Sequence, residues 1–397
     1  MRFTPRKSDP SNWFRFEVVA EETHYQALAA KRRDTPIELA SPLPNTPEPM
    51  LIAYRYADVA RIISDQTEFS TDSISVRYRP VLGRRTMLAL SWHERRHFRS
   101  VLGATLGQRN ASALRNDVVV PIIEGIIAEL RNRQVFDLVT EIASVIPSRV
   151  LARLLGLPAE VAPLLLRYAL AMIGFVEDPK YAIQKSRALR KLFRGLIEER
   201  HRAPSDDLVS RLLKTEDNDE GLPDEDVVDM LVLLTFAGTE TALPAIASMF
   251  FALLAHPDQL DAVRSAPELA RNAVEETLRW EAPVQATFRT AARDTSIAGV
   301  PVSEGTPVLA HIGSANHDVP GLLDPDLFNL LRPGPIHHLS FGLGAHRCVG
   351  AHLARLEMRL AMERIFSEWP KLRIVGGGIQ ITGQFVRRPA SLPVEVR

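Results

Sequence analysis

Cys348 is the only cysteine in this chain of 397 residues, and it lies in the glycine-rich segment 341–350. A single cysteine excludes an internal disulfide, and a structural zinc site normally needs several cysteine or histidine ligands at short spacing. Gly342 and Gly344 allow the backbone to turn tightly and to approach a flat partner closely. Peptide N–H groups around a sulfur can hold it as a thiolate below its free pKa of roughly 8.5. The segment therefore predicts one thiolate that is presented to one metal position, and haem iron with an axial cysteine is the best match.

The same segment contains every fixed residue of the pattern Phe-Gly-x-Gly-x-His-x-Cys-x-Gly, namely Phe341, Gly342, Gly344, His346, Cys348 and Gly350. It resembles the haem-binding loop of the cytochrome P450 family. The resemblance implies haem b as the cofactor, Cys348 as the axial ligand of its iron, and cofactor contacts from Phe341, Gly342, His346 and Gly350. The plainer alternative is a buried structural cysteine in a glycine-rich loop.

The composition is that of a large globular protein without an excess of either charge. The chain has 48 Lys+Arg against 48 Asp+Glu and 46% hydrophobic residues, so it can bury a large core and carries no net charge that would select a nucleic acid. Residues 1–10 include no apolar stretch of the kind that a signal peptide or a membrane anchor requires. The longest apolar stretch, 230–255, is interrupted by polar residues at 239–241 and predicts a buried helix. We expect a cytoplasmic protein without a membrane anchor and without a nucleic-acid partner.

Helix and strand patterns occupy separate blocks of the chain. The segments at about 35–55, 284–312 and 372–397 have strand-like alternation and turn residues, whereas about 56–280 and 349–368 have helical periodicity. No repeat or low-complexity linker divides the sequence, so we expect residues 1–397 to form a single domain. The fold class is mainly α (α+β), with a large helical body and a small β lobe. The resemblance implies the cytochrome P450 fold, with haem buried between a long central helix and the cysteine loop.

A second chemical motif lies in the middle of the apolar stretch. Ala237 and Gly238 are small enough for a planar ligand to lie against the backbone, and Glu240 with Thr241 forms an acid–alcohol pair that could pass protons. The apolar flanks predict burial, where an unpaired carboxylate costs several kcal/mol. Pro244 has no N–H for the carbonyl of Glu240, so the helix should open there, although an ordinary kink that adjusts packing is the alternative. The resemblance implies that Glu240 and Thr241 are catalytic and deliver protons during dioxygen activation.

A third motif, Glu276-x-x-Arg279, precedes the cysteine loop by roughly seventy residues. Exposed pairs at this spacing contribute only about 0.2–0.5 kcal/mol, so the spacing alone is a weak signal. The resemblance implies that Glu276 and Arg279 form a buried pair that braces the fold around the haem. Their role would be structural and not catalytic.

Cations for the two haem propionates are expected from three segments. Arg289 lies on a probable strand with apolar neighbours, where a guanidinium offers planar and permanent charge to a carboxylate. The resemblance implies the same role for Arg95 and Arg99, one helical turn apart, and for His346. The segment around them departs from the bacterial pattern, in which Asp-Pro-Pro is usual at positions 91–93. Three neighbours compete for the role, namely Trp92, His93 and Arg96.

The resemblance implies a haem-thiolate monooxygenase that uses dioxygen and two electrons from NAD(P)H to hydroxylate, epoxidise or dealkylate a small organic substrate. The sequence contains no flavin or iron–sulfur segment, so a separate ferredoxin and ferredoxin reductase are implied, docking near Cys348 and Arg96. Several alternatives stay open: a haem-thiolate isomerase or coupling enzyme, a haem-based sensor or carrier, and a peroxide-driven variant. A zinc site of His337 and His338 with Cys348 lacks the usual tetrahedral spacing, and we expect these histidines to be packing or surface residues.

The substrate cannot be named from the sequence. By family position, the walls of its pocket should come from segments 71–87, 234–241 and 284–287 and from residues 384 and 385. Arginines in the first segment suggest an anionic substrate such as a carboxylate, although exposed loop arginines are commoner than substrate contacts. They are Arg77, Arg79, Arg84 and Arg85.

Overall fold

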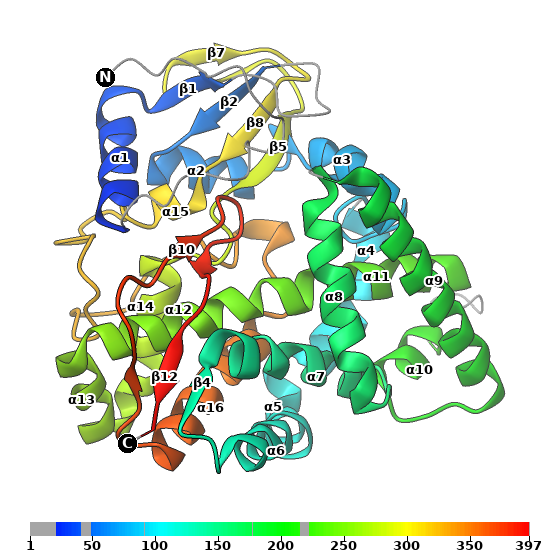
Figure 1. Cartoon of the computed structure of the whole chain (residues 1–397). Coiled ribbons are helices and arrows are strands. Elements are labelled where there is room, and N and C mark those ends of the chain that lie inside the picture. The colour runs from blue at the N-terminus through cyan, green and yellow to red at the C-terminus, as the bar shows by residue number, and fades with distance from the viewer. Residues whose placement is uncertain (1–20, 41–48, 91, 177, 215–221, 397) are drawn as a thin grey trace.

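The computed structural model of the chain describes residues 21–40, 49–90, 92–176, 178–214 and 222–396. Helices form the larger part of the molecule, and most strands gather in a lobe at one end (Figure 1). The mainly α fold with a small β lobe is therefore confirmed. The proline-rich stretch at 41–48 and residues 1–20 lie outside the described residues.

The helices account for most of the two segments that were expected to be helical. They are α1 (Glu21–Asp34), α2 (Tyr56–Ser64), α3 (Asp72–Leu82), α4 (Trp92–Leu106), α5 (Ala111–Ala113), α6 (Val120–Leu130), α7 (Val145–Leu154), α8 (Ala162–Ile173), α9 (Pro179–Arg202), α10 (Leu208–Leu213), α11 (Asp224–Glu240), α12 (Ala242–Ala255), α13 (Pro257–Ser265), α14 (Ala270–Trp280), α15 (Ile312–Ala315) and α16 (Ala351–Glu368).

Among the described residues, the strands are short and form four small sheets. They are β1 (Ile37–Ala40), β2 (Met50–Ala53), β3 (Phe69–Ser70), β4 (Val135–Asp137), β5 (Thr287–Ala291), β6 (Thr295–Ile297), β7 (Val300–Val302), β8 (Pro307–Ala310), β9 (Arg373–Ile374), β10 (Ile381–Thr382), β11 (Arg388–Pro389) and β12 (Pro393–Glu395). The largest sheet has the order β1-β2-β8-β5-β3, and the others are β4-β12-β9, β10-β11 and β6-β7. The main sheet therefore joins strands from the first seventy residues to strands from the region 287–310.

The five-stranded sheet positions side chains for the site. Strand β5 pairs with β8 in antiparallel register, with Phe288 opposite Leu309 and Arg289 opposite Val308. Because successive side chains of a strand point to opposite faces, Arg289 and Phe288 face different sides of β5. Helix α2 contacts β8 and β5.

Helices α11 and α12 form the long central helix of the molecule, and α12 crosses its middle in Figure 1. Their path breaks at Thr241, as expected from Pro244, which has no N–H to donate to the carbonyl of Glu240. Within the described residues, Asp224–Ala255 is the one helical segment long and apolar enough to cross a membrane, but 72% of its most apolar window is buried inside the fold. The predicted buried helix is confirmed. Apolar residues of α6, α7, α14 and α16 pack around α12, and those of α8 and α9 pack around α11.

Candidate active site

The cysteine loop is a tight turn that leads into α16. The Cys348 N–H donates a hydrogen bond to the carbonyl of Phe341 at 2.8 Å, which closes the loop on itself. Gly342 and Gly344 have φ values of 67° and 66°, a region in which other residues are strained. A Cβ atom at Gly344 would also lie 3.0 Å from the carbonyl oxygen of Ser64 on α2. The two glycines are therefore required by the turn and by its close approach to the sheet lobe.

The Cys348 sulfur has an unusual combination of surroundings. Its side chain is exposed, yet it lies in dense protein, and burial raises the pKa of the thiol. A sulfur that is accessible although protein surrounds it borders space that a ligand can occupy, and we call this space the hollow. The Gly350 N–H and the nearby charges of Arg99, Arg355 and Arg347 act in the opposite direction and lower this pKa. These groups favour the anionic form of the sulfur, which is the form that binds a metal.

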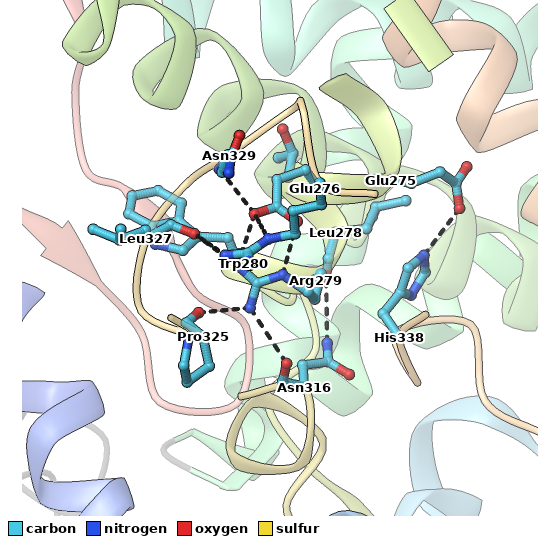
Figure 2. Close-up of polar contacts among 12 residues, drawn as sticks. Glu275, Glu276, Leu278, Arg279, Trp280, Asn316, Pro325, Leu327, Asn329 and His338 are labelled. Carbon is cyan, nitrogen blue, oxygen red and sulfur yellow. Dashed lines mark hydrogen bonds and ion pairs between the residues drawn. The ribbon is translucent and has the colours of Figure 1, made fainter. Parts of the chain in front are cut away.

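Arg355 and Glu275 hold the first residue of the loop in place. The Arg355 guanidinium lies 4.3 Å from the centre of the Phe341 ring, and its Nε and Nη2 bond the Glu275 carboxylate at 2.6 and 2.8 Å. His338 Nε2 lies 3.1 Å from the same carboxylate, as Figure 2 shows. Burial alone would raise the pKa of Glu275. The bonds from Arg355 and His338 have the larger combined effect, and the resulting pKa is lowered to about 2. His338 thus packs against the loop, and no group of three or more metal-ligating side chains is found in the described ranges.

Helix α11 has its small residues at an accessible place within an otherwise largely buried helical segment. Ala237 and Gly238 are exposed, although the next two residues, Thr239 and Glu240, are only 0% and 4% exposed. A Cβ atom added at Gly238 would meet no atom within 4 Å. The Thr241 hydroxyl donates to the carbonyl of Ala237 at 2.8 Å. The middle of this interior helix therefore borders open space along a flat strip.

The Glu240 carboxyl lies beside this strip. Burial raises the pKa of Glu240 well above its ordinary value, which favours the protonated form of the carboxyl. Burial and the nearby Glu240 raise the pKa of the Tyr78 phenol to about 12. The Tyr78 ring lies 5.6 Å from the ring of Phe236, one helical turn before Glu240. Tyr78 was not among the expected site residues, and its only signal in the sequence is its place in the segment 71–87.

Buried cations form a cluster on the other side of β5 from Phe288. Arg95 is 2% exposed and Arg289 is 6% exposed, and Arg95 Nη1 lies 2.7 Å from His346 Nδ1. The described hydrogen bonds of Arg289 go to neutral oxygens, including Thr287 Oγ1 at 3.3 Å. Burial and Arg95 lower the pKa of Arg289 to about 10, and burial with both arginines lowers the pKa of His346 to about 3. Buried cations that repel one another are stabilised by an anion between them.

The other predicted cations lie elsewhere. Arg99 Nη1 donates to the carbonyl of Arg347 at 2.9 Å, which places Arg99 at the cysteine loop, while its charge also acts on His346. Arg96 is exposed. The side chains of Trp92 and His93 lie outside the described residues.

The site fits haem on three independent features. The accessible sulfur with adjacent N–H and arginine groups suits an axial thiolate, and the strip at Ala237 and Gly238 leaves room for a planar ring. The cluster of Arg95, Arg289 and His346 suits two carboxylates at one edge of that ring. Helices α4 and α11, strand β5 and the cysteine loop therefore each contribute residues expected to hold the cofactor.

The expected buried pair of Glu276 and Arg279 is present (Figure 2). Both side chains are 0% exposed, and Arg279 Nε lies 2.8 Å from Glu276 Oε2. Arg332 Nε and the Asn329 N–H also bond Glu276, at 3.0 and 2.9 Å, while Arg279 Nη1 donates to the carbonyl of Pro325 at 2.7 Å. The pair ties α14 to the segment that precedes the cysteine loop. Arg332 was missed because its distance along the chain gives no local pattern.

Comparisons with known proteins agree with this arrangement. A family model described as Cytochrome P450 matches residues 175–370. The chain is 31% identical over 352 residues to the mycinamicin IV hydroxylase/epoxidase of Micromonospora griseorubida, covering 86% of this chain and 88% of the relative. It is 33% identical over 364 residues to the vitamin D(3) 25-hydroxylase of Pseudonocardia autotrophica, covering 89% and 88%. A crystal structure of a cytochrome P450 in complex with an acyl carrier protein ligated to hexadec-9Z-enoic acid superposes with a TM-score of 0.86 at 28% identity, covering 95% of this chain and 98% of that one.

Proposed function

This chain belongs to the cytochrome P450 family and is a haem-containing monooxygenase, and we propose that Cys348 ligates the haem iron while Glu240 and Thr241 supply protons to the reaction. We further propose that the enzyme hydroxylates, epoxidises or dealkylates a small organic substrate. Its electrons come from NAD(P)H through a separate ferredoxin and ferredoxin reductase. The observation that carries the proposal is the accessible Cys348 sulfur inside dense protein, with the Gly350 N–H and three arginine charges beside it.

Bound haem supplies the redox chemistry by which dioxygen is activated and one oxygen atom is transferred. The chain's own contribution on the cysteine side is to hold the sulfur as an anion. The Gly350 N–H and three arginine charges support that form, and Arg355 with Glu275 fixes the loop through Phe341. Arg95, Arg289 and His346 orient the cofactor by its carboxylates.

Burial raises the pKa of the Glu240 carboxyl, which favours the form that can donate a proton. The helix break leaves this carboxyl and the Thr241 hydroxyl at the border of the hollow, where Thr241 Oγ1 is already oriented by the carbonyl of Ala237. A protonated carboxyl next to a hydroxyl can pass a proton into a dry chamber, where bulk water is scarce.

The docking surface for the redox partner is proposed on the cysteine side of the molecule. Arg96 and Arg347 are exposed there, and Arg99 links the two segments by its bond to the carbonyl of Arg347. Exposed positive charge near the electron acceptor favours an acidic partner such as a ferredoxin. A cytoplasmic location remains a prediction from the sequence.

The absorption spectrum of the reduced protein with carbon monoxide tests the assignment of Cys348. We expect a strongly red-shifted Soret band, and we expect a Cys348→Ser variant to lose it. A Thr241→Ala variant is the matched control, because it changes the other side of the hollow and should keep the band. A band that is typical of histidine ligation and survives the Cys348 substitution would overturn the proposal.

A further inference from the structure

Helix α3 covers the space between β5 and α11. At its start, the Ser73 N–H donates to Thr290 Oγ1 on β5 at 3.1 Å. Ile74 packs with Phe288, and further along the helix Tyr78 packs against Phe236 of α11. Because α3 contacts both elements, its residues between these points lie between β5 and the part of α11 in which Ala237 and Gly238 follow Phe236.

The four arginines of this region have different surroundings. The backbone N–H groups of Arg84 and Arg85 donate to Asp229, and Arg85 Nε pairs with Asp226 at 2.9 Å, so this end of the segment is tied to α11. Arg79 is exposed.

Arg77 is half-buried and differs from the other three. Its guanidinium lies 4.6 Å over the ring of Phe288, which is 7% exposed and stacks on Phe385 at 5.5 Å. Its Nε is buried and has no hydrogen-bond partner among the described residues. Burial lowers the pKa of Arg77, and the one neighbouring group that acts on it is the Tyr78 phenol rather than a carboxylate. The cation therefore lies on an aromatic surface, and no carboxylate among the described residues pairs with it.

We propose that Arg77 binds the carboxylate of the substrate, and that the substrate is an apolar carboxylic acid. A planar guanidinium matches a carboxylate through parallel N–H···O bonds, and one cation suits a monoanion better than a phosphate. The inference rests on the proposed monooxygenase function and names the substrate class of the same site.

Aromatic side chains that can contact the apolar part of the substrate lie between Arg77 and Glu240. Tyr78 follows Arg77 on α3, and its ring lies 6.4 Å from Phe175 and 5.6 Å from Phe236. Phe236 leads to Glu240 one turn later on α11. Since Phe288 and Arg289 face opposite sides of β5, an anion on Arg77 does not compete with the cofactor for Arg289. Oxidation should therefore occur on the apolar body and away from the carboxylate.

Ligand-induced shifts of the Soret band test the proposal without requiring turnover. The ligands are two pairs, decanoate with decanamide and phenylbutanoate with phenylbutanamide. The members of each pair have the same apolar part and differ in the charge of the head group. We expect at least one carboxylate to bind about tenfold more tightly than its amide, because a hydrogen-bonded charge pair is involved. We expect Arg77→Gln to abolish this preference. Arg79→Gln is the matched control, because Arg79 is an exposed arginine of the same helix, and we expect this variant to keep the preference.

Equal affinities within both pairs, or a preference that survives Arg77→Gln, would overturn the proposal. Phenylimidazole, which ligates haem iron directly, separates this failure from failure of the proposed function. A protein that binds phenylimidazole but prefers no carboxylate refutes the substrate class alone, whereas a protein without any haem response refutes the monooxygenase assignment. Unchanged affinity of Arg77→Gln for phenylimidazole confirms that the variant is folded.

Discussion

At the scale of single residues, burial gives Glu240 its chemistry. The side chain is 4% exposed, and its carboxyl keeps a proton at a pH where an exposed glutamate would have lost it. Thr239, the preceding residue, is fully buried and bonds the carbonyl of Thr235, so it turns its hydroxyl away from the hollow. Neighbouring polar residues on one helix thus have unrelated roles, and the direction in which each side chain points decides between them.

A Glu240→Gln variant should keep the haem spectrum and substrate binding but form product about 10²-fold more slowly, because an amide cannot donate the same proton. Since burial raises the pKa of the carboxyl and only its protonated form can donate, wild-type activity should fall as the pH rises through that raised pKa. Product formation measured across pH, with electrons supplied in excess, checks both statements. A variant with the wild-type rate and pH profile would contradict the proposed role.

At the scale of elements, the break between α11 and α12 follows from one missing N–H. A Pro244→Ala variant restores a donor for the carbonyl of Glu240, and we expect the turn to close and the proton path to narrow. The ratio of product formed to NAD(P)H consumed should fall severalfold, while the carbon monoxide spectrum stays unchanged. Pro257→Ala is the control, because Pro257 occupies the first turn of α13, where no intrahelical N–H bond is lost. An unchanged ratio would favour the alternative, in which Pro244 produces an ordinary helix kink that only adjusts packing.

The pair of Glu276 and Arg279 shows how burial changes the weight of one spacing. Asp261 and Arg264 have the same i,i+3 spacing on α13, but their side chains are 70% and 35% exposed. Arg279→Ala leaves a buried carboxylate without its main partner and should lower the free energy of unfolding by about 3–5 kcal/mol. Arg264→Ala should change it by less than about 1 kcal/mol. Chemical denaturation of the haem-loaded proteins measures both values, and equal effects would contradict this interpretation.

At the scale of the whole molecule, the balanced net charge hides a local asymmetry. Positive groups surround the cysteine loop, where Arg96 and Arg347 are exposed, although the chain as a whole has no net charge. Electrostatic attraction at such a surface acts mainly on encounter with an acidic partner and is screened by salt. The prediction of a single domain is not tested by these features and stays a prediction.

Charge reversal in Arg96→Glu should weaken binding of an acidic ferredoxin about tenfold at low ionic strength, and the difference should shrink as salt is added. Arg187→Glu is the control, because Arg187 is an exposed residue of α9, outside the elements that surround Cys348. Binding can be followed by titration and by the rate of reduction. Equal binding by the wild type and by Arg96→Glu at every salt concentration would place the docking surface elsewhere.

The sequence by itself determined the cysteine loop, the break at Pro244, the mainly helical fold and the family, because each depends on residue types at fixed local spacing. It could not determine which arginine serves which anion. Arg95 meets Arg289 and His346, Arg99 turns to the cysteine loop, and Arg77 lies on Phe288, although all belong to similar arginine-containing segments. The sequence also did not reveal that Tyr78 lies near Glu240 or that Arg332 bonds the Glu276 carboxylate. These contacts join residues far apart in the chain, and only the packing of helices, strands and loops in the folded molecule brings them together.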